Sequence, residues 1–63
     1  MKTKYYEAMS VASGYRGRIY QYKDDQERTE VVWLSPETYP TEAEALDAAV
    51  EWAEDHDMEV TLG

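Results

Sequence analysis

Residues 41–56, TEAEALDAAVEWAEDH, carry the clearest structural signal in the chain and predict its helix. Thr41 is a favourable N-cap residue, and Glu44 stands three residues later, so the two complete a capping box. Acidic residues in the first turn also suit the positive end of the helix dipole. We therefore expect the helix to run from Glu42 to about His56.

This helix is predicted to be amphipathic. At about 100° per residue, its apolar stripe consists of Ala43, Leu46, Ala49, Val50 and Ala53. Acidic side chains gather on the opposite side, while Ala45 and Trp52 fall on the flank between the two. The stripe needs an apolar surface to cover, and we expect the residues before the helix to provide it as a sheet.

Three strands are predicted before the helix, at residues 4–11, 15–23 and 28–34. Ser13 and Gly14 supply a turn signal between the first two, and a polar cluster at residues 24–27 ends the second. The third strand ends in a β-branched and aromatic run. Two successive hairpins of this kind make an antiparallel meander, which a loop at residues 35–40 joins to the helix.

We therefore predict a single α+β domain over residues 1–63. An antiparallel three-stranded meander packs on one C-terminal helix in the order β-β-β-α. The alternation in residues 58–62 is compatible with a short fourth strand. Because one helix covers one face of the sheet, the other face is left to solvent or to a partner.

The composition is that of a small globular protein of high negative charge. The 63 residues carry a net charge of −8, and the aromatic residues are six Tyr and two Trp with no Phe. Cysteine is absent, which excludes disulfides and thiolate metal sites. No apolar run approaches the length of a membrane span, and residues 1–6 contain no apolar signal region. We expect a soluble cytoplasmic protein without membrane association, and dimerisation stays open.

The charges are divided unevenly along the chain. Residues 1–28 contain all six Lys and Arg residues and four acids, so they net +2. Residues 29–63 contain ten acids and no base, so they net −10. An asymmetry of this kind bears on association and on the steering of partners rather than on the fold.

The first candidate site is the acidic side of the predicted helix with the tail behind it. Carboxylates spaced along one surface could imitate a run of nucleic-acid phosphates and occupy a basic groove on another protein. Trp52 is placed either to anchor such a partner or to fold back over a sheet edge. A face kept acidic for solubility is the simpler alternative, although solvated helix faces normally interleave both signs. The candidate residues are Glu44, Asp47, Glu51, Trp52, Glu54, Asp55, Asp57 and Glu59.

The second candidate site is one face of the second strand, which carries Arg16, Arg18, Tyr20 and Tyr22. If Ile19 faces the helix, these side chains form an exposed stripe suited to stacking on bases and contacting phosphates. The negative net charge opposes nucleic-acid binding. The alternative is an ordinary amphipathic strand whose Arg residues pair with Glu7 or Glu30 across the sheet.

No catalytic or metal-binding arrangement is predicted. The chain has one His and neither a nucleophile elbow nor a phosphate-binding loop. The acidic cluster at residues 24–27 lacks the Gly and the distal Glu of a calcium loop. His56 lies between two Asp residues near the helix end, where a protonated imidazole is favoured, and we expect no further role for it. We therefore expect no enzymatic activity, no cofactor and no metal.

Around the start of the helix, the chain resembles two families of small domains built from three strands and a helix. It is similar to the AP2-type DNA-binding domains, and to their relatives the arm-type DNA-binding domains of phage integrases, at Trp33, Leu34, Tyr39, Thr41 and residues 42–46. It is similar to the YegP-like bacterial domains, a family of largely unknown function, at Ser35, Glu37, Tyr39 and Thr41. Each resemblance covers roughly residues 15–53 and implies the same fold. The first also implies DNA binding by the sheet.

Three functions are compatible with these patterns. The leading hypothesis is a small non-catalytic binding protein, of the type of a phage- or defence-related inhibitor. Its acidic helix face would imitate DNA and contact a protein with a basic surface. The first alternative is a nucleic-acid-binding module that uses the Arg and Tyr side chains of the sheet. The second is a structural domain that self-associates through a sheet edge.

Overall fold

The computed structural model of the chain describes residues 3–23 and 28–63. Its elements are, in chain order, β1 (Lys4–Val11), β2 (Gly14–Tyr22), β3 (Thr29–Leu34), α1 (Glu42–Asp55) and β4 (Thr61–Leu62). This order confirms the predicted α+β fold of the type β-β-β-α. The polar cluster at residues 24–27, expected to end the second strand, lies outside the described residues.

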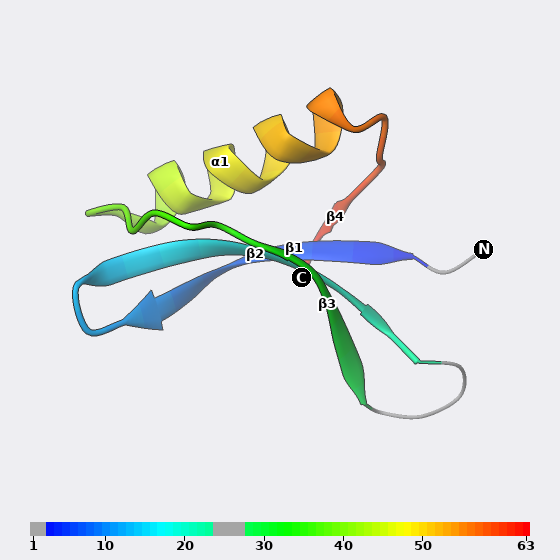
Figure 1. Ribbon diagram of the computed structural model, residues 1–63, viewed down its shortest axis with the longest axis horizontal. Coiled ribbons are helices and arrows are strands. Elements are labelled where there is room, and N and C mark those ends of the chain that lie inside the picture. The colour runs from blue at the N-terminus through cyan, green and yellow to red at the C-terminus, as the bar shows by residue number, and fades with distance from the viewer. Residues whose placement is uncertain (1–2, 24–27) are drawn as a thin grey trace.

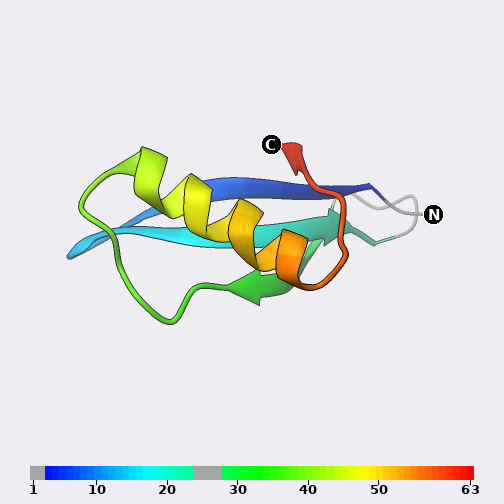
Figure 2. The ribbon, with the colours of Figure 1, turned by 90° about the horizontal axis from the view of Figure 1, so that it is seen from above.

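The four strands form one sheet in the order β3-β2-β1-β4, and α1 lies over one face of it (Figure 1, Figure 2). β1 and β2 pair antiparallel along their length, from Lys4 opposite Gln21 to Val11 opposite Gly14. β3 pairs antiparallel with β2 and has an irregular register opposite Ile19 and Tyr20. β4 adds two residues parallel to β1, so the fourth strand exists but is shorter than the alternation in residues 58–62.

The hairpin between β1 and β2 turns through two residues and depends on Gly14. The φ angle of Gly14 is +143°, a backbone conformation that other residues rarely adopt. A Cβ atom at Gly14 would also collide with the Tyr39 carbonyl group. The register that this turn sets decides which side chains of the two strands share a face.

Both ends of α1 are capped. The Thr41 hydroxyl accepts a hydrogen bond from the backbone N–H three residues later at 3.2 Å, as expected of an N-cap. At the other end, the Met58 N–H donates to the Ala53 carbonyl at 2.8 Å and the Asp57 N–H donates to the Glu54 carbonyl at 3.2 Å. This pair of bonds is a Schellman motif, in which Asp57 takes the left-handed position with φ of +52°.

Small side chains dominate the contact between the helix and the sheet. Ala45, Ala49 and Ala53 are buried, and Ile19 of β2 is the large apolar side chain buried beneath them. The predicted apolar stripe was therefore wrong at one edge, because Ala43 is exposed. Ala45, which the pattern placed on the flank, belongs to the core. Within the described ranges, no helix has the length and apolarity needed to span a membrane.

The helix approaches the sheet most closely at Gly17. A Cβ atom at this position would lie 2.6 Å from the Ala45 carbonyl oxygen and 3.4 Å from the Ala49 nitrogen. Because protein interiors are close-packed, a side chain here would push the helix away from β2. The absence of a side chain at Gly17 thus lets the backbone of α1 rest almost directly on the backbone of β2.

Ser35, which follows β3, is completely buried. Its hydroxyl accepts a hydrogen bond from the Gly17 N–H at 3.0 Å and donates to the Glu37 carbonyl at 2.8 Å. Its own N–H donates to the Gly17 carbonyl at 2.8 Å. Further along the loop, Tyr39 and Tyr15 exchange two backbone hydrogen bonds of 2.9 and 2.7 Å. The loop therefore completes the hydrogen bonding of β2 where β3 leaves the sheet.

Gly17→Ala is expected to lower the free energy of unfolding by about 1–3 kcal/mol, because the added methyl group displaces the helix. Urea unfolding of the two proteins measures the difference. Where the backbone has room, the same substitution raises stability by reducing the freedom of the unfolded chain. An unchanged or higher free energy of unfolding would contradict the close approach at this residue.

Ser35→Ala is expected to lower the free energy of unfolding by about 1–3 kcal/mol, because it leaves the buried Gly17 N–H without an acceptor. Ser10→Ala is the matched control, since Ser10 is exposed on β1 and its loss should change stability by less than about 0.5 kcal/mol. Equal effects of the two substitutions in urea unfolding would disprove the role given to the Ser35 hydroxyl.

Candidate functional site

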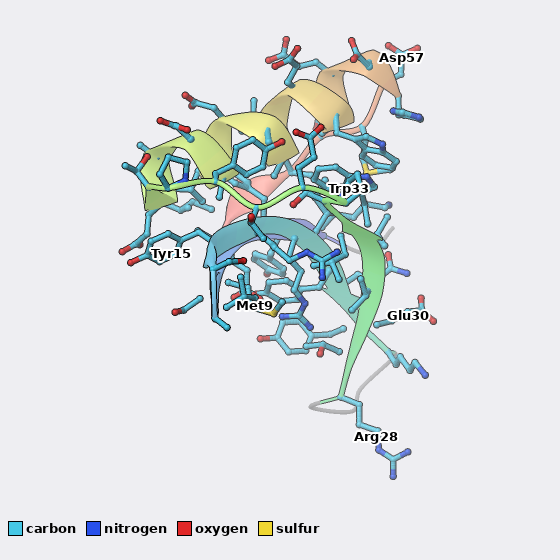
Figure 3. All side chains as sticks on the ribbon, turned by 60° about the vertical axis from the view of Figure 1, so that its left-hand side comes forward. Met9, Tyr15, Arg28, Glu30, Trp33 and Asp57 are labelled. Carbon is cyan, nitrogen blue, oxygen red and sulfur yellow. The ribbon has the colours of Figure 1, made fainter. Side chains whose placement is uncertain are left out.

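The carboxylates predicted as a binding surface are all exposed. Those on α1 lie opposite the buried alanines, and Figure 3 shows carboxylate groups along the outer side of the helix as far as Asp57. The structure therefore brings most of the predicted acidic residues onto one surface. We call it the acidic helix face, and it consists of Glu44, Asp47, Glu51, Glu54, Asp55 and Asp57.

The acidic helix face has no Lys or Arg partner among the described residues, and the pair between Arg18 and Glu7 lies within the sheet. α1 has no basic residue in its last turn, where Glu54 and Asp55 meet the negative end of the helix dipole. Asp57 adds a carboxylate in a left-handed conformation that glycine adopts at lower cost. This end of the helix therefore loses stability through its charges.

Glu59 follows the helix and lines an open hollow of about 1000 Å³ at one end of the sheet. Asp57 of the acidic helix face lines the same hollow, together with Lys4 and His56, so charges of both signs meet there. The part of Glu59 in the predicted acidic surface stays a prediction.

Trp52 lies half-buried between two other rings. Its indole stacks on Trp33 of β3 with centroids 5.1 Å apart, and on the imidazole of His56 at 4.0 Å. His56 is the C-cap residue of α1, and its Nδ1 lies 2.8 Å from the Trp52 carbonyl oxygen. This stack of three rings holds the C-terminal end of α1 against β3. Trp52 therefore folds back onto the sheet, and its contact with a partner stays a prediction.

The second candidate site lies on the face of the sheet that α1 does not cover. Ile19 faces the helix and is fully buried, so the alternate residues of β2 share the uncovered face, as predicted. The register adds Tyr5 of β1 and Val31 of β3, which both pair with Tyr20. We call this surface the open sheet face, and it consists of Tyr5, Glu7, Met9, Arg16, Arg18, Tyr20, Tyr22, Val31 and Leu34.

Three tyrosines form a cluster on the open sheet face. Tyr5 stacks on Tyr20 with ring centroids 5.6 Å apart, and Tyr22 meets the two rings edge-on at 5.8 and 6.0 Å. Tyr5 was not among the residues predicted for this site. A two-residue hairpin that pairs Val11 with Gly14 also sets Tyr5 opposite Tyr20. The turn expected at Ser13 and Gly14 lies one residue further along the chain than the observed turn, so the sequence did not set Tyr5 opposite Tyr20.

The two arginines of the open sheet face make contacts within the protein. Arg18 pairs with Glu7 of β1, and its guanidinium lies 5.0 Å from the centroid of the Tyr20 ring. Arg16 donates a hydrogen bond from Nε to the Ser35 carbonyl oxygen at 2.8 Å. The predicted pairing of an Arg residue with Glu7 across the sheet is thus confirmed for Arg18.

Tyr20 is the tyrosine most strongly affected by this environment. Burial raises the pKa of its phenol above the ordinary value of 10.0. The neighbouring Tyr22 and Glu7 raise the pKa further, while Arg18 acts in the opposite direction. The neutral phenol is therefore favoured in the folded protein, because burial and the neighbouring Tyr22 and Glu7 outweigh the opposite effect of the Arg18 guanidinium.

No protein-family model matches the chain, and no curated protein or solved structure shows significant similarity to it. The resemblance to AP2-type, integrase arm-type and YegP-like domains therefore stays a prediction. Across residues 3–23 and 28–63, no three His, Asp or Glu side chains converge in a way that would hold a metal ion. The acidic helix face and the open sheet face are therefore the two candidate binding surfaces of the described residues.

Tyr20 is expected to ionise above its ordinary pKa of 10.0 in an alkaline titration. Because its folded pKa lies above the unfolded value of 10.0, its contribution to stability is complete below about pH 10 and is lost as the pH rises through the folded pKa. Phenolate absorbance of the wild type and of Tyr20→Phe checks this. The variant should lack a late-titrating phenol, and loss of an early one would contradict the assignment.

Proposed function

We propose that this protein is a non-catalytic binding protein that presents its acidic helix face to a basic surface on another protein. Its carboxylates would take the places that nucleic-acid phosphates occupy in the partner's groove. The observation that carries this proposal is the position of Glu54, Asp55 and Asp57 at the negative end of the helix, where the last turn contains no Lys or Arg and none of the described Lys and Arg side chains forms an ion pair with them.

These three carboxylates lower the free energy of unfolding of a domain whose small size already makes it marginally stable. An exposed acid at a helix C-terminus is destabilising by about 0.3–1 kcal/mol, and a chain of 63 residues buries too little surface to absorb many such losses. Solubility would be served equally well by acids in the middle of the helix, where the dipole has no effect. Local rules are broken in this way mainly at functional sites, so we infer that these acids are kept for binding.

The separation of charge in space also supports the proposal. The acidic helix face points away from the sheet, while Lys4, Arg16 and Arg18 belong to the strands. One side of the molecule therefore produces a negative field that the described residues do not compensate. A field of this kind steers a basic partner toward the helix and raises the association rate more than the affinity.

The partner implied by this surface is a protein with a basic groove or patch, such as the nucleic-acid-binding surface of another protein. An inhibitor encoded by a phage or acting in bacterial defence would have this size and charge. The partner and the biological context are both proposals, and they rest on the same electrostatic argument.

Nucleic-acid binding by the open sheet face has weaker support. Phosphate contacts need free cations, whereas Arg18 is paired with Glu7 and Arg16 with a carbonyl oxygen. Base stacking needs exposed ring faces, whereas Tyr5 and Tyr20 cover each other and Arg18 lies over Tyr20. We therefore propose the protein partner alone.

Glu51→Gln/Glu54→Gln is expected to weaken the capture of basic proteins from a bacterial lysate by about tenfold, because it removes two charges from the contact. The wild-type complexes should be displaced by duplex DNA and by salt. The free variant should be at least as stable as the wild type in urea, since Glu54 opposes the helix dipole. Weaker capture by a protein of undiminished stability separates loss of contact from loss of structure.

Glu30→Gln/Glu37→Gln is the matched control, because it removes the same number of charges from exposed residues outside the acidic helix face. It should capture as well as the wild type. Equal capture by all three proteins, or capture that duplex DNA fails to displace, would rule out the proposed role of the helix.

A further inference from the structure

We infer that the open sheet face binds the same face of a second copy of this chain, so that the protein forms a face-to-face dimer. This surface lies opposite the acidic helix face, and the inference does not depend on the function proposed for the helix. It rests on the side chains of the face, on its size, on the distribution of charge around it and on the contacts that its rings and cations make within the chain.

The open sheet face has the composition of an interface core. Tyr, Met and Arg are enriched where proteins meet, and the tyrosine cluster lies on the same face as Met9 and Arg18. Tyr22 and Val31 expose 43% and 51% of their surface, although both adjoin the cluster. In the described part of the chain, the one helix lies on the other side of the sheet (Figure 1). A partner from outside is therefore needed to bury these side chains.

The size of the face suits a weak dimer. Its nine residues are fewer than the roughly 20–30 that each partner contributes to a standard interface, and seven of them are already half-buried in the single chain. The dimer is therefore expected to form at high protein concentration. Two twisted sheets can pack face to face, either nearly aligned or at right angles.

The distribution of charge favours a second copy in this orientation. Two chains of net charge −8 repel each other, and contact through the helices would bring two acidic helix faces together. Contact through the sheets places both acidic helix faces on the outside, away from each other. Glu7 and Arg18 neutralise each other, so the charge left on each face is that of Arg16, whose half-buried guanidinium is hydrogen-bonded to the neutral Ser35 carbonyl.

The rings of the cluster suit a protein surface better than nucleobases. The faces of Tyr5 and Tyr20 are occupied by each other and by the Arg18 guanidinium, and Gly63 lies against the Tyr20 hydroxyl, which leaves ring edges and the other two hydroxyl groups for contact. A two-fold axis through the cluster would make this contact self-complementary, as in most homodimers. If the proposed function of the helix also holds, such a dimer presents two acidic helix faces and binds paired basic sites with avidity.

Sedimentation equilibrium of the full chain tests the dimer. We expect the mass to rise with concentration from 7.3 kDa toward twice that value. We also expect dimerisation to strengthen with added salt, because salt screens the repulsion between the two copies. Salt weakens the binding of a basic partner to the acidic helix face, so the failure of one proposal can be distinguished from the failure of the other.

Tyr22→Glu/Val31→Glu is expected to raise the dissociation constant of the dimer by about tenfold or more, since it places four charges in the contact. Both side chains are exposed in the single chain, so circular dichroism should show a folded protein. Thr38→Glu/Leu62→Glu adds the same charge at exposed residues outside the open sheet face and should dimerise like the wild type.

A wild-type mass that stays at 7.3 kDa up to about millimolar concentration in high salt would overturn the inference. Equal weakening by the two double variants would overturn it as well, because dimerisation would then depend on net charge alone. A monomer whose Tyr5 and Tyr22 ring resonances shift on addition of a single-stranded oligonucleotide would identify nucleic acid as the occupant of this face instead.

Discussion

The close contact between two backbones, that of α1 and that of β2 at Gly17, controls how the whole domain is assembled. With no side chain at Gly17 and alanines on the helix above it, α1 settles deeply enough to bury Ile19. Ser35 is bonded to the same glycine through its hydroxyl and its backbone, so the loop that leads to the helix is anchored at the same point. A side chain at this position would disturb the core, the loop and the helix together.

A single helix on one side of a sheet leaves the molecule with two unlike outer surfaces. On the helix side, carboxylates face solvent without an ion pair to any described Lys or Arg. On the sheet side, tyrosines and internally paired arginines form a surface of low net charge. A charged surface of one sign suits an oppositely charged partner, whereas an aromatic surface of low charge suits burial against a protein. The two surfaces can therefore serve two different associations at once.

The C-terminal end of α1 combines opposing contributions to stability. The carboxylates of Glu54 and Asp55 meet the negative end of the dipole, and Asp57 holds a left-handed conformation. Against these, the Schellman motif satisfies the last carbonyl groups, and the stack of Trp33, Trp52 and His56 holds the helix end on the sheet. The ring stack and the cap thus offset the stability that the acidic residues cost this end of the helix.

Local pattern was sufficient to predict the order of the elements, the start of the helix at Thr41 and the acidic side of the helix. These features depend on capping and on side-chain periodicity within one segment, which can be read along the chain. Alternation likewise placed the Arg and Tyr residues on one face of β2. Contacts between distant segments decided the remaining features. They set the rotation of the helix about its axis that buries Ala45, the pairing of Tyr5 with Tyr20 and the parallel pairing of β4. They also set the bonds that Arg16 and Arg18 make within the protein. A pattern inside one segment does not say which segment will lie opposite it, so it could reveal neither the close approach at Gly17 nor the internal use of both arginines.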